Sequence, residues 1–368
     1  MHKRSQSYIV IGLLCSTMIN FCSTSMTTTN SLFLIMPGMS HEGFNQFLAH
    51  QKEDGPLDQK YDPFFDTIRG SSHGKIINLL PRFMDIGQKN CQDFFENEAL
   101  KFLAPQTDSH YSNIYFLGGS QGSVPLFWFI HKYANDPTII GKIKGIVVEG
   151  FVASANAAIF HAFKNRMSSK IANLPFAYYW VPYLMKIDYP FYMPHGSQVI
   201  HLGKIIGKIK SLHDKPIIFI HDVNDAIVPI ELTRAMYYAL KSGGHPNVYY
   251  IETNNRPLYL PSHVNLLFSH SHPQQIKALK HILNPYLNTQ DNFVDLTVYQ
   301  PDHTHPQFKK AYFDLVAKEM PFSSRKFQIA IKALSLSSKI SLLCMILYKT
   351  GVVHFIQQLA KAIRQDPV

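Results

Sequence analysis

Short apolar runs alternate with segments of helical length over most of this chain, and this alternation limits its possible folds more than any other feature. The runs are rich in Ile, Val, Leu and Phe, which is typical of strands buried on both faces of a parallel sheet. Helical segments lie between them, for example at residues 90–104, 124–133 and 230–242. We expect strands at residues 32–36, 75–80, 113–117, 143–149, 216–221 and 248–252. The sequence therefore predicts an α/β fold, a mostly parallel sheet flanked by helices.

Two segments depart from this alternation. Residues 151–212 are far longer than a usual connection between strands and are dense in aromatic residues, so we interpret them as an inserted helical cap. Within it, Phe176, Tyr179 and Trp180 are candidates to line an apolar pocket. Later apolar residues at helical spacing predict a helical C-terminal extension. The expected boundaries are 26–290 for the main domain, about 151–212 for the cap and 291–368 for the extension.

The start of the chain has the pattern of a secretory signal peptide. Basic residues are followed by an apolar run at residues 8–21 and by small residues at 23–25. That run is too short for a comfortable membrane span. We therefore expect residues 1–25 to direct export, to a secreted or periplasmic location. The alternatives are an uncleaved anchor, or a cytoplasmic protein whose translation starts at Met26.

The chain is basic, with 35 Lys and Arg residues against 25 Asp and Glu residues and a formal net charge of +10. A positive balance can draw a protein to an anionic membrane surface or to nucleic acid. No zinc-finger spacing, RNA-binding aromatic signature or glycine-rich phosphate loop accompanies it. We therefore expect no nucleic-acid partner, while peripheral contact with a membrane stays open. The sequence predicts neither a metal site nor a cofactor.

The pattern Gly-x-Ser-x-Gly stands at Gly118, Ser120 and Gly122, directly after an expected strand and before an expected helix. A serine on such a sharp turn needs small residues two positions before and after it, and its hydroxyl is then exposed. Ser120 is therefore the candidate nucleophile. The alternative is a glycine-rich turn with no chemical role.

A serine hydroxyl is a weak nucleophile near neutral pH, so it needs a base to take its proton and an acid to orient that base. Asp225 is the candidate acid, because it lies in a short loop between the strand at 216–221 and a helix. Asp222 and Glu149 are the rival carboxylates. Each of the two follows or ends an expected strand.

Three histidines follow the last expected strand, and one of them is the candidate base. His263 lies in a loop that turns into a helix, where its imidazole can reach the edge of the sheet. His270 is the runner-up, and His272 is the third candidate. The chain holds 19 histidines, so most of them have other roles.

The oxyanion that forms during acyl transfer needs hydrogen-bond donors, which are usually backbone N–H groups. One is expected from Gln121, directly after the candidate nucleophile. The other is expected from the loop after the first strand, at Met39. An ordinary turn at the end of the strand is the alternative there.

Together these segments resemble the α/β-hydrolase superfamily over roughly residues 32–283. The resemblance rests on residues 118–122, residues 216–229 and His263. The superfamily often has His-Gly where this chain has Pro37 and Gly38. The Ser-Gln-Gly sequence at the nucleophile is also similar to palmitoyl-protein thioesterases.

These observations predict a serine hydrolase that cleaves carboxylic esters or thioesters with an apolar acyl part. Its partner is then a small acyl ester or thioester. A peptidase of the same fold is one alternative. The other is a catalytically silent protein on the same scaffold that binds a lipid or a partner, since one fold hosts many functions.

Overall fold

The structure is a computed structural model. It describes residues 31–36, 74–78, 88–104, 111, 113–166, 173, 177–185, 196–254, 273–283 and 294–320. The described residues include six strands: β1 (Ser31–Met36), β2 (Gly74–Asn78), β3 (Asn113–Gly119), β4 (Ile143–Glu149), β5 (Ile217–Asp222) and β6 (Val248–Thr253). They form one sheet in the order β2-β1-β3-β4-β5-β6, and every strand pair in it is parallel. The predicted fold class, a parallel sheet flanked by helices, is confirmed.

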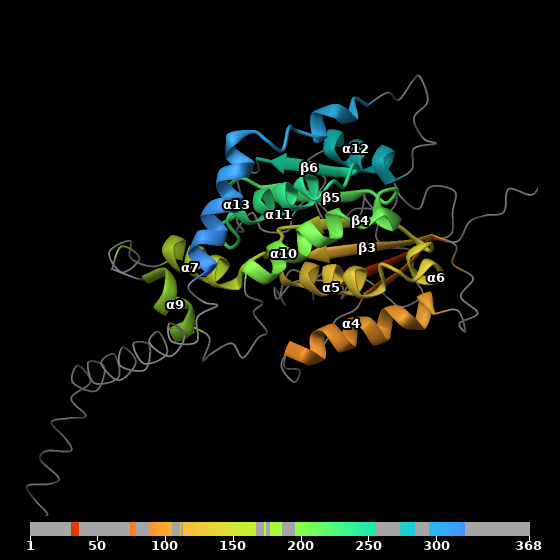
Figure 1. Cartoon of the computed structure of the whole chain (residues 1–368), viewed down its shortest axis with the longest axis horizontal. Coiled ribbons are helices and arrows are strands. Elements are labelled where there is room, and N and C mark those ends of the chain that lie inside the picture. The colour runs from red at the N-terminus through yellow and green to blue at the C-terminus, as the bar shows by residue number, and fades with distance from the viewer. Residues whose placement is uncertain are drawn as a thin grey trace, which may run out of the picture.

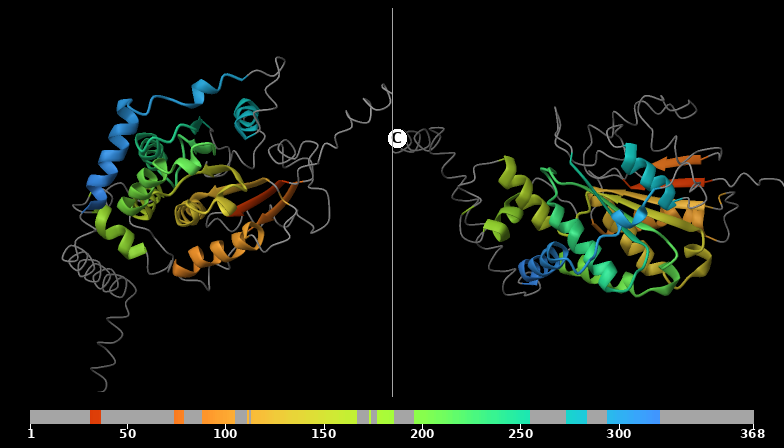
Figure 2. Two further views of the ribbon diagram at one scale, coloured as in Figure 1. Left: turned by 45° about the vertical axis from the view of Figure 1, so that its right-hand side comes forward. Right: turned by 90° about the horizontal axis from the view of Figure 1, so that it is seen from above.

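Helices cover both faces of this sheet (Figures 1 and 2). The α-helices are α4 (Gln88–Leu103), α5 (Ser123–Tyr133), α6 (Pro137–Ile140), α7 (Ala155–Arg166), α9 (Ala177–Met185), α10 (Gly196–Gly207), α11 (Ile230–Ser242), α12 (Pro273–Leu283) and α13 (Pro306–Glu319). Short 3-10 helices are η1 (Ser120–Gly122), η2 (Lys210–Leu212) and η6 (Leu296–Tyr299). Among the described helices, none is long and apolar enough to span a bilayer.

Alternate residues of each strand contribute to two separate cores. Side chains such as Phe116, Ile146 and Phe219 face the larger core, which α4, α5, α10, α11 and α13 cover. Their neighbours along the strands, such as Leu117 and Val147, face a smaller core that α12 covers. Because both faces are buried, the strands read as near-continuous apolar runs in the sequence.

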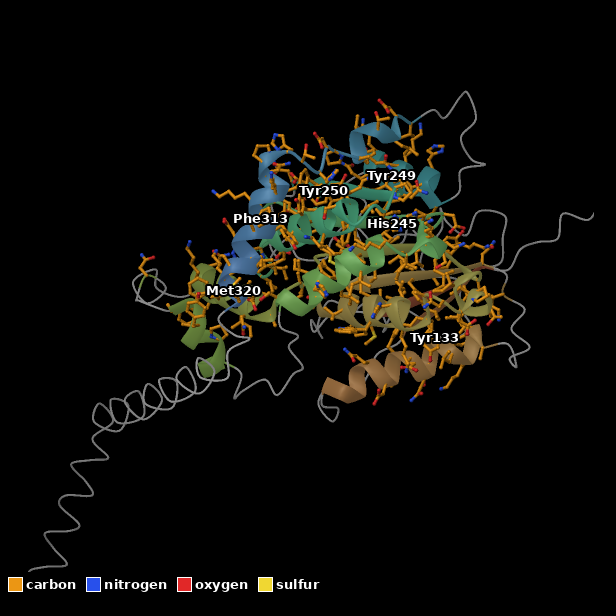
Figure 3. All side chains as sticks on the ribbon, in the orientation of Figure 1. Tyr133, His245, Tyr249, Tyr250, Phe313 and Met320 are labelled. Atoms are coloured by element: carbon orange, nitrogen blue, oxygen red, sulfur yellow. The ribbon has the colours of Figure 1, made fainter. Side chains whose placement is uncertain are left out.

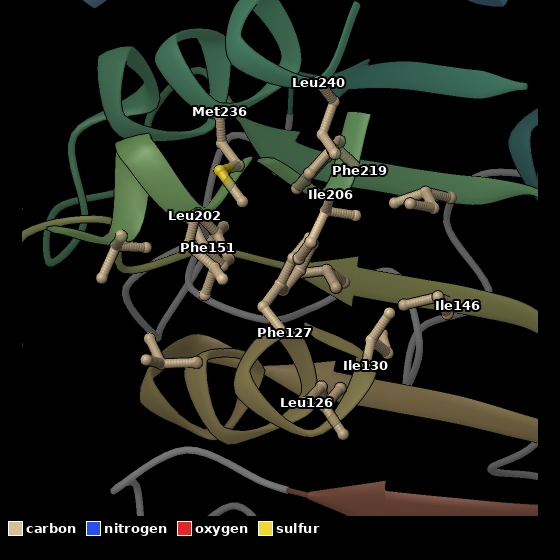
Figure 4. Packing of buried hydrophobic residues seen from close by; sticks show 14 of the residues in the cluster. Leu126, Phe127, Ile130, Ile146, Phe151, Leu202, Ile206, Phe219, Met236 and Leu240 are labelled. Carbon is tan, nitrogen blue, oxygen red and sulfur yellow. The ribbon is translucent and has the colours of Figure 1, made fainter. Parts of the chain in front are cut away.

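Helix α10 lies within the segment that the sequence analysis assigns to the cap, yet it packs on the sheet layer. Its Leu202 and Ile206 are buried beside Phe127 and Phe219 (Figure 4). Gly203 and Gly207 allow α10 to lie close to α11 as well. A Cβ at Gly207 would stand 2.4 Å from the Leu240 carbonyl oxygen of α11. Helices α7 and α9 instead pack against each other beyond the end of the sheet (Figure 1).

Candidate functional site

The carboxyl ends of the strands meet at one edge of the sheet, and the chain reverses its direction of winding there. From β1 the chain passes outward to β2, and then returns to β3 on the other side of β1. Open α/β sheets bind their ligands at this kind of switch point. Met36, the last residue of β1, pairs with Gly118 of β3, two residues before Ser120. Ser120 therefore lies at the switch point.

The backbone at Ser120 adopts a conformation that few non-glycine residues take. Its φ is +51°, and it is the one non-glycine residue with positive φ in the described part of the chain. Such strain costs on the order of 1–2 kcal/mol and is found mainly at functional sites. The chain passes at once from β3 through η1 into α5. This is the sharp strand-to-helix turn that the sequence predicts.

Gly118 makes that turn sterically possible. A Cβ at this position would stand 2.6 Å from Leu126 Cδ1 and 2.8 Å from the backbone Cα of Ser123. Gly122, in contrast, has a φ of −63°, which any residue can adopt. Of the two glycines in the motif, Gly118 is thus the one for which the packing leaves no room for a side chain.

The turn is held by a side chain from the first turn of α5. Ser123, fully buried, donates a hydrogen bond from Oγ to the carbonyl oxygen of Ser120. The N–H of Gln121 lies in η1, just before α5, and the first backbone donors of a helix have no carbonyl partner within it. That N–H can therefore serve an oxyanion. Met39, the second expected donor, lies outside the described residues.

Asp225 lies in the loop between β5 and α11, and the loop backbone holds its carboxylate. Oδ1 accepts hydrogen bonds from the N–H groups of Ile227 and Val228, at 2.8 and 2.9 Å. The residue is 6% exposed. Two backbone donors to one oxygen fix the direction in which the other oxygen points. The carboxylate is thus buried and oriented, as the acid of a triad must be.

His221, the fifth residue of β5, lies next to that carboxylate. Its Nε2 donates to the Val228 carbonyl oxygen at 3.0 Å and lies 3.5 Å from Asp225 Oδ2. Its Nδ1 is 2.6 Å from Thr233 Oγ1 in α11. The ring is fully buried. It therefore ties the end of β5 to the loop and to the following helix.

The two rival carboxylates are held in different ways. Asp222 accepts from the Asn224 N–H at 2.8 Å and from Thr253 Oγ1 at 3.0 Å, so both of its oxygens serve the loop and β6. Glu149 ends β4 opposite Gly119 and is 4% exposed. Strand β4 lies between β3 and β5. Asp225, in the loop after β5, is therefore two strands from Ser120, or about 10 Å at the usual spacing.

The three candidate bases, His263, His270 and His272, lie outside the described residues. So does Phe176, and the side chain of Trp180 is likewise outside them. Tyr179 is described as partly buried, with its ring against Tyr178 at a centroid distance of 5.3 Å.

Helix α7 is bonded directly to the loop that carries Asp225. His161 Nε2 donates to the Asp225 carbonyl oxygen at 2.9 Å, and Asn165 Nδ2 donates to the Ala226 carbonyl oxygen at 3.2 Å. Neither residue stands out in the sequence. The repeat of polar residues on one face of α7, at i and i+4, is the signal that could have revealed them.

A buried polar cluster of three residues joins α13 to the same part of the chain. Glu319, the last residue of α13, is fully buried and accepts hydrogen bonds from Ser154 Oγ at 2.6 Å and from the Tyr178 hydroxyl at 2.7 Å. Burial, and then the negative charge of Glu319, raise the pKa of Tyr178 above its usual range. We call these residues the Glu319 cluster. The sequence analysis missed it.

Within the described residues, no group of three or more His, Cys, Asp and Glu side chains is placed to hold a metal ion. What the described site offers is a strained serine, a helix N-terminus beside it, and a buried, oriented carboxylate two strands away. These parts suit acyl transfer, in which a base between serine and carboxylate completes the set.

Comparison with known proteins gives structural similarity without sequence similarity. No family model matches the chain, and no curated protein matches it. An esterase of Pyrococcus furiosus is similar with a TM-score of 0.42 and 14% identity, over 70% of this chain and 82% of that one. The Est1E protein of Butyrivibrio proteoclasticus has a TM-score of 0.37 and 12% identity, over 72% and 89%. A sugar hydrolase from Lactococcus lactis has a TM-score of 0.40 and 12% identity, over 72% and 92%.

Proposed function

We propose that this chain is a serine hydrolase of the α/β-hydrolase superfamily that cleaves carboxylic esters or thioesters with an apolar acyl part. The strained backbone of Ser120, at the switch point of a parallel sheet, is the observation that supports this most. Ser120 is 8% exposed, so its hydroxyl is less exposed than the sequence predicts. A turn of this shape costs free energy, and placing a nucleophilic hydroxyl at the switch point is a reason for a chain to keep it.

In the proposed reaction, Ser120 Oγ attacks the carbonyl carbon of the substrate while the base, His263, takes the hydroxyl proton. The N–H groups of Gln121 and Met39 stabilise the oxyanion. Collapse of the tetrahedral intermediate breaks the bond to the alcohol or thiol, and His263 returns the proton to that leaving group. A water then attacks the acyl-enzyme with His263 as base, which releases the acid and restores Ser120.

Asp225 is the proposed acid, since its carboxylate is oriented by two backbone donors and lies across β4 from the nucleophile. There it holds the imidazole in one tautomer and stabilises the imidazolium that forms during the reaction. Asp222 is engaged on both oxygens by the loop and by β6. That engagement favours a structural role for Asp222.

A serine-directed fluorophosphonate tests the nucleophile. We expect it to label the wild-type protein and not Ser120→Ala, because alanine fits the turn but has no hydroxyl. Ser242→Ala is the control, an exposed serine at the end of α11 away from the turn, and should still be labelled. Labelling of Ser120→Ala as strong as wild type would overturn the assignment. A wild-type protein that stays unlabelled would favour the silent binding protein.

The apolar acyl part is proposed from the aromatic composition of the cap, including Phe176, Tyr179 and Trp180. Contact of one such ring with an acyl chain is worth on the order of 1 kcal/mol at roughly 25 cal/mol per Å². We expect kcat/KM to rise from acetyl to decanoyl esters, and alanine at each position to lower the decanoyl value more than the acetyl value. An unchanged ratio in all three variants would place the acyl pocket elsewhere.

Export of the mature chain is proposed from the basic start and the apolar run at residues 8–21. N-terminal sequencing of the protein from its native cells checks this. A mature chain that lacks the apolar run and begins at a residue other than Met26 agrees with export. An intact Met1 or a start at Met26 contradicts cleavage.

A further inference from the structure

A cavity of about 450 Å³ lies between α7, α9, α11 and α13, beside the proposed catalytic residues but separate from them. Ser120, Asp222 and the side chain of Asp225 take no part in its lining. It adjoins the loop that carries Asp225 through two of its lining residues, His161 and Pro229. Figure 1 shows α7 close to the end of α13, and Figure 3 labels Met320, the residue that follows α13. The volume is within the range of small-molecule sites.

One face of α7 and one face of α13 form the walls of this cavity. The lining positions on α13 recur at three- and four-residue intervals, from Gln307 to Lys318, which is one side of a helix. The apolar part of the lining includes Phe160, Leu232 and Leu315. Phe160 also packs edge-on against Tyr178, at a centroid distance of 5.5 Å. A chain of methylene groups can lie between the two helices.

Charged side chains stand around this apolar space. Lys164, Lys310 and Lys318 line it with the carboxylates of Glu231 and Asp314. Within the described part of the chain, no lysine of this set forms an ion pair with a carboxylate. Lys318 instead places its Nζ 5.8 Å from the centre of the Tyr178 ring.

The charges of the lining side chains indicate which charge a ligand should carry. Arg234 also lines the cavity, but Glu252 neutralises it through hydrogen bonds of 3.1 and 2.8 Å. Among the described lining residues, three ammonium groups and two carboxylates leave one net positive charge. A monoanion balances that charge, whereas a multiply charged anion meets repulsion from the two carboxylates. The apolar walls require that the monoanion carry an apolar part.

We propose that this cavity is a second binding site, for an amphiphilic monocarboxylate with an aliphatic tail. Its head is held by Lys164 and Lys310 from opposite walls, and its tail lies along Phe160 and Leu315. A ligand of this class has the chemistry of the acid that the proposed hydrolysis releases. The site itself is inferred from the cavity and its charges, and it does not depend on the proposed function.

Decanoate, below its micelle concentration, is the probe, and isothermal titration calorimetry of the full chain carrying Ser120→Ala is the measurement. Decanol has the same tail without the charge, and acetate has the charge without the tail. We expect decanoate to bind at least tenfold more tightly than either. Equal affinities for decanoate and decanol would overturn the proposal.

Variants of the lining locate the bound decanoate. Lys164→Gln and Lys310→Gln should each weaken binding about three- to tenfold. Asp314→Asn should strengthen it, a result that partial unfolding cannot imitate. The control is Lys208→Gln, an exposed lysine after α10 near the far end of α11, and it should bind as the parent does. If the lining variants match this control, decanoate binds elsewhere and the proposal is wrong.

These outcomes are independent of the nucleophile test. Decanoate binding that depends on Lys310 stands even if the fluorophosphonate labels nothing. Conversely, Ser120 can be labelled while the lining variants bind decanoate as the parent does. In that case the proposed hydrolase activity stands and the proposed second site is wrong.

Discussion

The turn at Ser120 and the Glu319 cluster are both built around buried polar groups, but they are assembled in opposite ways. At the turn, Gly118, Ser120 and Ser123 lie within six consecutive residues, and their own sterics and hydrogen bonds set the backbone. In the cluster, Glu319 meets Ser154 and Tyr178 across 165 and 141 residues of sequence. The geometry of the turn is therefore determined by residues that are neighbours in the sequence. The Glu319 cluster forms only when distant parts of the chain have folded together.

This comparison predicts that changes at the long-range cluster lower stability with little effect on the rate, while changes at local elements lower the rate, the stability or both. The largest effect is expected from Asp225→Asn, which keeps the loop shape but removes the charge that stabilises the imidazolium. We expect kcat to fall by about 10³–10⁴-fold, or about 4–5.5 kcal/mol of transition-state stabilisation. The hydrolysis of a nitrophenyl ester measures it.

Asp222→Asn and Glu149→Gln are the matched controls for the acid and should be comparatively mild. If either one lowers kcat more than Asp225→Asn does, that residue is the acid. The folded state of each variant is checked by its far-UV circular dichroism.

Gly118→Val tests the sterics of the turn. The new Cβ would stand 2.8 Å from backbone that cannot move without shifting α5, so we expect the free energy of unfolding to fall by about 3 kcal/mol or more. Gly122→Ala, where φ is −63°, should change it by less than about 0.5 kcal/mol. Urea unfolding measures both. Equal effects at the two glycines would mean that the close approach at Gly118 is not what shapes the turn.

Glu319→Ala tests the long-range cluster. It leaves two hydroxyls of the cluster without their acceptor, so we expect a loss of about 2–3 kcal/mol in the free energy of unfolding. Glu319→Gln keeps an acceptor oxygen and should cost about half as much. Hydrolysis of a short ester should change by less than tenfold in both variants. A collapse of kcat with normal stability would give Glu319 a part in the reaction itself.

The smallest effect concerns His245, which lies after α11 and away from both regions. Burial, and then the positive charge of His213, lower the pKa of His245 to about 4. The unfolded chain therefore takes up this proton more readily, and stability falls as the pH drops from about 6.5 towards 4. Between pH 7 and pH 5 we expect a loss of about 2 kcal/mol. In His245→Gln, this decrease in the free energy of unfolding between pH 7 and pH 5 should be absent. The control His201→Gln, at an exposed position, should show the same decrease as wild type.

How far the sequence predicts the structure follows the same division. All six described strands lie within two residues of their expected bounds, because a strand buried on both faces must be apolar along its whole length. The turn at Ser120 was predictable for the same reason, since its requirements fall on neighbouring residues. Asp225 lies in the loop between strand and helix, as predicted. The contact of its carboxylate with the His221 ring could not be predicted from the neighbouring residues.

The rest depends on distant contacts. Gly203 and Gly207 are four residues apart and signal a close helix contact, yet the sequence does not say that α11 is the partner. Glu319 looks like one more charged residue on an amphipathic helix. It can be buried because it accepts hydrogen bonds from two hydroxyls that lie more than 140 residues earlier in the chain.

The Glu319 cluster also has a consequence for the order in which the protein becomes complete during synthesis. Ser154 and Tyr178 emerge early, and every strand that the structure describes has been made by Thr253. Their acceptor follows only at the end of α13. A nascent chain can therefore form its sheet while these two hydroxyls are still hydrated. Contacts between residues so far apart in the sequence form late and slowly. We therefore expect α7 and α9 to take their final positions only after α13 has been made.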